Sequence, residues 1–168
     1  YSADLLERSR VHMWESGTYG SVKRKRELKD FLSYRGPRTF IMNVEALSTV
    51  DAAREAVETF CKRRTVVAID ESTCIMNHDA ERTKYILKYV KPLADYRYIL
   101  SGLITPRSPL NLYTQFDFLD WKILGHKSFY TFQREYAVLK LMDMGGRKFN
   151  MVVGYRDQRA GSRANLMF

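Results

Sequence analysis

The chain has 168 residues, which is enough for one domain of ordinary size and too few for two comfortable ones. Hydrophobic residues make up 45% and aromatic residues 13% of the sequence, and this content excludes a largely disordered chain. No apolar run approaches the ~20 residues of a membrane-spanning helix, and two cysteines cannot form a disulfide framework. These features favour a reduced, cytoplasmic setting with no membrane partner.

The net charge of +9 is unevenly distributed. Residues 1–64 hold thirteen basic and nine acidic side chains, residues 65–124 hold seven of each, and residues 125–168 hold eight and three. A neutral centre with basic flanks fits a polyanionic partner such as nucleic acid, because lysines and arginines that bind phosphates release condensed counterions. The alternative is a cationic surface that has no polyanionic partner.

Short β-prone runs alternate with helical patterns in the first hundred residues. Residues 65–69 form the clearest strand, and because they are apolar after Thr65 we expect burial on both faces, as in a parallel sheet. Ser21 is the expected N-cap of a helix whose apolar positions are Val22, Leu28, Phe31 and Leu32. The other expected strands are 11–14, 39–43 and 96–100, and the other expected helices begin at Thr49 or Asp51 and, with Asp79 as the cap, at Ala80.

After Gly102 the pattern changes to an aromatic-rich stretch, 113–136, which is expected to be helical in parts. Gly145-Gly146 predicts a turn, and 148–153 a strand or an extended arm. The alternation of strands and helices predicts an α/β fold with a parallel sheet and right-handed crossovers. We expect a lobe at 1–108, a mostly helical appendage at 109–155 and a flexible tail at 156–168.

Two adjacent carboxylates, Asp70 and Glu71, follow the clearest strand. Open α/β sheets bind ligands at the carboxyl ends of their strands. An aspartate placed there can hold Mg²⁺ through its water shell, and a neighbouring glutamate can take a proton from an attacking water. The alternative is that the pair merely ends a strand and begins a loop.

Further segments accompany this pair in a fixed order: 43–49, 70–77, 82–84, 98–102, 108–116, 118–120, 124–125, 128–130, 132, 134, 136–138 and 145–149. Together they resemble the first lobe of the Swi/Snf-type (superfamily 2) helicase-like ATPases, most closely the versions found in bacteriophages and bacteria. The resemblance extends from about Val11 to Arg156, and it implies a partial RecA-like parallel sheet flanked by helices.

The resemblance also implies roles for single residues. Asp70 would position Mg²⁺ through water, and Glu71 would be the general base of ATP hydrolysis. Ser101, Gly102 and Thr73 would couple the nucleotide state to the grip on nucleic acid. Asn43 and Glu45 would lie near the nucleic-acid track or brace it.

Basic side chains supply further candidate contacts to nucleic acid. Their charge and position suggest phosphate contacts, and solvated helix faces are at least as good an interpretation. These residues are Lys23, Arg24, Lys25, Arg26, Arg82 and Lys84.

The sequence departs from the family pattern in three places. Thr73 stands where many relatives have histidine, and Ser101-Gly102-Leu103-Ile104 replaces the usual Thr-Gly-Thr-Pro, with Thr105-Pro106 two positions later and Arg107 where asparagine is common. The third departure is the largest. The chain contains no Gly-x-x-x-x-Gly-Lys-Ser/Thr phosphate loop, the motif that cradles nucleotide phosphates, and no second lobe with its arginine finger.

These absences lead to two hypotheses. The first is an interior segment of an ATP-dependent DNA helicase or translocase, which uses ATP and Mg²⁺ in the intact protein but binds neither tightly in this chain alone. The alternative is a non-catalytic nucleic-acid-binding or assembly module derived from such a lobe. The expected partners are duplex DNA, bound without sequence specificity, and the missing parts of the same ATPase.

A sheet edge is the third expected contact surface. The strand that would lie beside 96–100 in a complete lobe is missing, so this segment should become an edge strand. We expect the edge either to pair with another copy of the chain or to be covered by 148–153.

Overall fold

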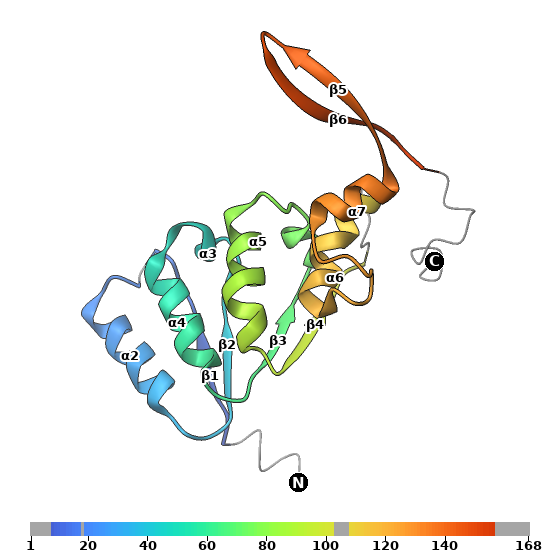
Figure 1. Cartoon of the computed structure of the whole chain (residues 1–168). Helices are drawn as coiled ribbons and strands as arrows, with labels where there is room; N and C mark the ends of the chain where they lie inside the picture. The colour runs from blue at the N-terminus through green and yellow to red at the C-terminus, as the bar shows by residue number, and fades with distance from the viewer. Residues whose placement is uncertain (1–7, 18, 103–107, 157–168) are drawn as a thin grey trace. The chain divides into compact units, whose positions relative to one another are not determined.

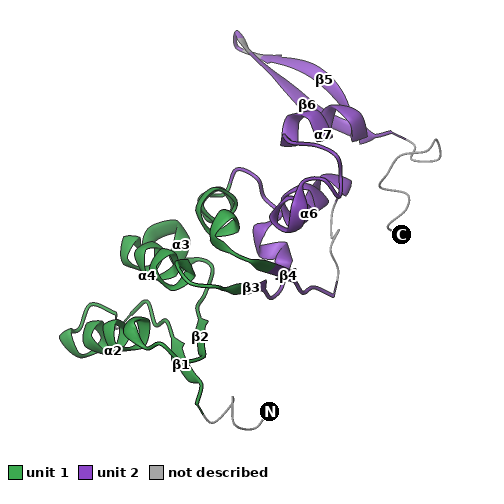
Figure 2. Cartoon of the chain, turned by 60° about the horizontal axis from the view of Figure 1, so that its bottom comes forward, with its two compact units in different colours: residues 1–67, 80–96 green, residues 68–79, 97–168 purple. Residues whose placement is uncertain are grey.

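The computed structural model describes residues 8–17, 19–102 and 108–156. It is a mixed α/β protein, as predicted, that divides into two compact units (Figures 1 and 2). The first unit comprises residues 1–67 and 80–96, and the second comprises 68–79 and 97–168. The part of the chain that the structure describes holds its strands in three separate two-stranded sheets, so the expected single parallel sheet is not continuous.

The first sheet pairs β1 (Arg10–Met13) with β2 (Arg38–Ile41) in parallel. The crossover between them carries α2 (Val22–Ser33), and the Ser21 Oγ accepts the Arg24 backbone N–H at 3.2 Å, which confirms Ser21 as the N-cap. Of the four predicted apolar positions of this helix, Phe31 is buried and Val22 lies outside the core. It is 76% exposed, because it lies in the first turn, away from the buried side of the helix at Phe31.

The remaining helices of the first unit follow β2. They are α3 (Ala46–Thr49), α4 (Asp51–Cys61) and α5 (Glu81–Tyr85), which continues through a π-helical turn and a 3₁₀ turn to Leu93. Asp79 was wrongly predicted as a cap: α5 has Ala80 at that position, because Asp79 belongs to a turn in which its N–H donates to Asn77 Oδ1. The unit's core cluster contains Trp14, Ala46, Ala53 and Ala56.

The second sheet pairs β3 (Val66–Ile69) with β4 (Tyr96–Ile99). Tyr96 donates its N–H to the Thr65 carbonyl, and Leu100 donates to the Ile69 carbonyl at 2.9 Å, so the pairing is parallel. The prediction that β3 is buried on both faces is wrong, since Val66 is 58% exposed. Its pattern alternates because, in the described residues, one face of this small sheet has no covering layer.

One neighbour is hydrogen-bonded to β4 within the described residues, and that neighbour is β3. The strand therefore has a free edge there, as the sequence led us to expect. The predicted cover is wrong, because residues 148–153 belong to a strand that pairs elsewhere, with β5. A strand satisfies its backbone groups most readily with a neighbour to which a tight turn joins it, and the Gly145-Gly146 turn joins β6 to β5.

The second unit contains α6 (Leu112–Asp120), α7 (Phe129–Tyr136) and an antiparallel hairpin of β5 (Ala137–Met144) and β6 (Arg147–Tyr155). Helices within 113–136 and the Gly145-Gly146 turn are therefore confirmed. Both turn glycines have positive φ, 64° and 88°, as a two-residue hairpin turn of this kind requires. Seven residues form the core of the unit: Leu110, Leu112, Tyr113, Leu124, Phe132, Tyr136 and Ala137.

Candidate functional site

The acidic pair lies on the loop that follows β3, in the second unit. Both Asp70 and Glu71 are exposed, and among the described residues neither carboxylate has a basic partner. The Asp70 Oδ1 accepts the Glu71 backbone N–H at 3.0 Å, which fixes the orientation of the Asp70 side chain at the end of the strand. Within the described part of the chain, both carboxylates are therefore accessible to a metal ion or to a water molecule.

The backbone of Glu71 is in the left-handed helical region, with φ 47° and ψ 62°. It is the one non-glycine residue with positive φ in the described part of the chain. This conformation costs an L-residue roughly 1–2 kcal/mol, and such strain persists only where the surroundings determine it. The loop therefore holds Glu71 in a position that an ordinary strand-to-helix connection would avoid.

Buried hydrogen bonds determine this loop. The fully buried Ser72 donates its hydroxyl to Gln115 Oε1 at 2.6 Å and its N–H to the Leu100 carbonyl at 2.9 Å. Gln115 is buried as well, and its Nε2 donates to the Asn111 carbonyl at 2.7 Å. On the same helix, the Thr114 hydroxyl donates to the Ile75 carbonyl at 2.6 Å. Two polar side chains of α6 thus anchor the short 3₁₀ helix Ser72–Ile75 that follows Glu71.

The predicted coupling residues lie at the same end of the β3–β4 sheet. Ser101 and Gly102 come directly after Leu100, whose carbonyl accepts the Ser72 N–H. Thr73 lies half-buried inside the 3₁₀ helix, one residue after Ser72. The structure therefore brings Thr73, Ser101 and Gly102 close in the fold to the acidic pair, while Thr105-Pro106 and Arg107 lie outside the described residues.

Other predicted contacts belong to the first unit. Asn43 and Glu45 are exposed after β2, and the Asn43 Oδ1 accepts the Glu45 backbone N–H at 3.0 Å in a turn that leads into α3. On α5, Lys84 pairs with Glu81 at 3.2 Å and Arg82 is half-buried. Asn43 therefore has a structural use in its turn, and the charge of Lys84 is partly compensated.

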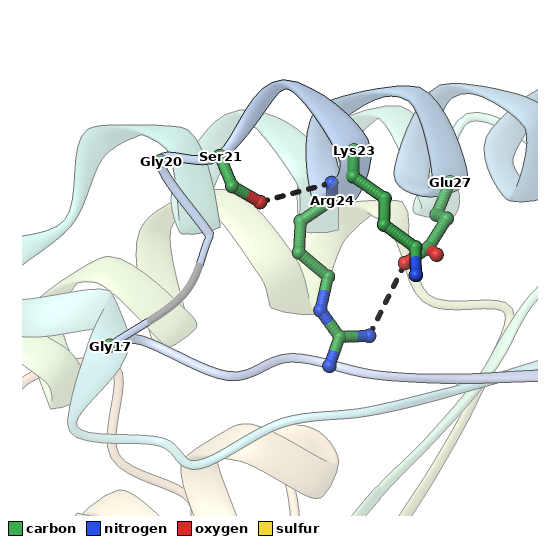
Figure 3. A pocket seen from close by; sticks show the side chains of 6 residues that line it. All are labelled: Gly17, Gly20, Ser21, Lys23, Arg24 and Glu27. Carbon is green, nitrogen blue, oxygen red and sulfur yellow. Dashed lines mark hydrogen bonds and ion pairs between the residues drawn. The ribbon is translucent and has the colours of Figure 1, made fainter.

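The basic run of α2 lies beside an open pocket of about 500 Å³ (Figure 3). The pocket is lined by Gly17, Gly20, Ser21, Lys23, Arg24 and Glu27. Arg24 is half-buried and forms ion pairs with Glu15 at 2.8 Å and with Glu27 at 3.3 Å. The other members of the basic run, Lys23, Lys25 and Arg26, are exposed. The positive end of the α2 dipole and the Lys23 ammonium attract an anion in this pocket, and the Glu27 carboxylate repels one.

The two cysteines lie in different environments. Cys61 is buried on α4, and burial raises the pKa of its thiol to about 11. Because the thiolate is the nucleophilic form, a raised pKa makes Cys61 unsuited to nucleophilic catalysis. Cys74 is half-buried in the 3₁₀ helix after Glu71, where its backbone N–H donates to the Glu71 carbonyl at 2.9 Å and helps to close the turn.

Sequence reasoning identified the two carboxylates and missed the residues that hold them. Thr114 and Gln115 lie within the 108–116 segment of the resemblance, but nothing in the sequence assigned either of them a role in holding the acidic loop. Within the described residues, no group of three histidine, cysteine, aspartate or glutamate side chains could hold a metal ion, and no helix is long and apolar enough to cross a membrane.

No protein-family model matches this sequence, and no curated protein matches it.

Proposed function

We propose that the chain is a partial RecA-like lobe from an ATP-dependent DNA helicase or translocase. The observation that carries the proposal is the acidic pair itself. Asp70 and Glu71 are exposed at the carboxyl end of a parallel-paired strand, and Glu71 keeps a strained backbone that buried hydrogen bonds determine. Strained residues of this kind cluster at active sites, and the order of the surrounding motifs resembles the Swi/Snf-type ATPases.

The donor set fits Mg²⁺ held mainly through water and phosphate oxygens. Mg²⁺ takes hard oxygen ligands, keeps several waters, and is usually bound by one or two carboxylates together with substrate phosphates. When bound, Mg²⁺ neutralises charge on the phosphates of ATP. Asp70 would accept hydrogen bonds from the waters around it, and Glu71 would orient a water molecule and take its proton.

The chain offers no cradle for the nucleotide phosphates, because it has no phosphate-loop sequence. The chain alone is therefore proposed to be inactive, with ATP bound tightly only in a longer protein. The same observation favours the second candidate function, a nucleic-acid-binding or assembly module without catalysis. In either case, pairing of the free β4 edge with another copy is a further proposed contact.

An ATPase assay tests the proposed function. This chain should show no DNA-stimulated ATP hydrolysis, and a version extended upstream to include an encoded phosphate loop should show it. Glu71→Gln should abolish turnover in the extended version, because an amide cannot accept the proton, while nucleotide binding remains. Turnover by this chain alone that disappears in the Glu71→Gln variant would contradict the assignment, and so would a fully active extended variant. If no phosphate loop is encoded in frame, the module hypothesis is favoured.

The basic run of α2 gives a second test. Replacing Lys23, Arg24, Lys25 and Arg26 with alanine should weaken binding to a DNA duplex at low salt. The dependence of log affinity on log salt should become shallower by about 0.9 for each phosphate that the variant no longer neutralises. Fluorescence anisotropy of a labelled duplex at several salt concentrations measures both effects. Affinity that is absent at low salt, or that does not change with salt, would favour a cationic surface with no polyanionic partner.

A further inference from the structure

The β5–β6 hairpin extends beyond α7 as a two-stranded ribbon (Figure 1). Its base is fixed: Ala137 is buried, Leu139 and its partner Val152 pack against the core of the second unit, and Arg156 donates its N–H to the Tyr136 carbonyl at 3.0 Å. Beyond the Leu139–Val152 pair, no described residue of the ribbon belongs to that core cluster. The ribbon therefore projects from a base that packs against the core of the second unit.

Both faces of the free part combine a lysine with apolar side chains. Cross-strand partners share a face, so Lys140 and Met151 lie with Met142 and Phe149 on one face. Lys148 lies on the other face, directly across from Asp143, together with Leu141, which is 62% exposed. Lysine is depleted from the cores of protein–protein interfaces. A lysine on each face is therefore a poor match for a protein partner.

The charge of the ribbon is suited to a polyanion. Residues 137–156 contain four basic side chains and one acidic side chain. The one acid, Asp143, lies across from Lys148 and accepts the Gly146 N–H at 2.9 Å, and the ribbon keeps an excess of three positive charges. The base of the ribbon adds a second exposed aromatic residue, Tyr155, to Phe149. Cationic side chains gathered on one projecting element are typical of surfaces that contact the phosphates of nucleic acid.

We infer that the β5–β6 hairpin enters a groove of duplex DNA, an inference that rests on the proposed function and adds a contact to it. The major groove is about 12 Å wide and accepts a two-stranded ribbon. With a rise of about 3.3 Å per residue, the part beyond Leu139 extends roughly 13 to 17 Å, more than the groove depth of about 8.5 Å. Lys140 and Lys148 contact phosphates, and Phe149 and Leu141 contact bases or sugars.

Binding of a labelled 20-base-pair duplex to the whole chain tests this inference. The double variant Lys140→Ala/Lys148→Ala should bind at least about tenfold more weakly at 50 mM salt, with a salt slope shallower by about 1.8. The matched control is Lys62→Ala/Lys122→Ala, which removes the same charge from two exposed lysines outside both proposed surfaces. Circular dichroism and thermal melting verify that each variant is folded.

A photo-crosslinking residue at the exposed position of Asn150 locates the partner directly. Crosslinking to DNA supports the inference, and crosslinking to a second copy in place of DNA overturns it. An equal loss of affinity in the hairpin and control variants also overturns it, because bulk charge then explains binding. If only the Lys23–Arg26 variant loses affinity, the inference fails while the proposed DNA partner stands. If the unaltered chain binds no DNA at low salt, both fail.

Discussion

Replacing Phe132 with alanine should lower the free energy of unfolding by about 3–5 kcal/mol. Phe132 is fully buried on α7, with its ring centroid 4.6 Å from that of Tyr136 and 5.6 Å from that of Tyr113. The substitution removes buried apolar surface and leaves a cavity that aromatic neighbours cannot fill without moving. Urea denaturation followed by circular dichroism measures the loss.

Tyr130, on the same helix, supplies the matched control. Its side chain is 61% exposed, so Tyr130→Ala should cost less than about 1 kcal/mol. The Phe132 substitution should also increase amide hydrogen exchange in β5 and β6, because Leu139 and Val152 pack on the cluster that it disrupts. Equal losses in the two variants would show that the cluster does not stabilise the second unit.

Local sequence signals predicted most of the elements. Ser21 caps α2 because a hydroxyl before a helical pattern can accept an orphan N–H, and that interaction needs no distant partner. The four-residue helix α3 has no predicted counterpart, since one turn is too short to show helical periodicity. β5 was also not predicted. Its alanine, leucine and methionine residues favour helix, and pairing with β6 across the two glycines overrides that preference.

The burial of β3 could not be predicted from the residues of the strand alone. Four apolar residues are consistent with a strand covered on both faces, and the number of covering layers depends on segments far along the chain. Asp70 and Glu71 could be identified because a strand end marks them locally. Their support could not, since Ser72 and Gln115 are 43 residues apart and no periodic pattern links them.

Replacing Gln115 with leucine should lower the free energy of unfolding by roughly 2–3 kcal/mol, because it leaves the buried Ser72 hydroxyl without its acceptor and removes the Gln115 donor from the Asn111 carbonyl. Leucine keeps a similar volume, so the loss reports on the hydrogen bond more than on a cavity. The substitution should also release the loop that holds Glu71 in its left-handed conformation. In an active extended version of the protein, the expected result is a lower rate of ATP hydrolysis.

The double variant Ser72→Ala/Gln115→Leu separates the hydrogen bond from packing. Replacing both partners of a buried hydrogen bond with apolar groups can be nearly neutral, so the double variant should recover about 1 kcal/mol or more relative to Gln115→Leu alone. The double variant should therefore regain stability. It should not regain the orientation of the loop, so the rate of ATP hydrolysis should stay low. If Ser72→Ala destabilises the Gln115→Leu protein further, the Ser72 hydroxyl has another acceptor and α6 does not position the acidic pair through Gln115.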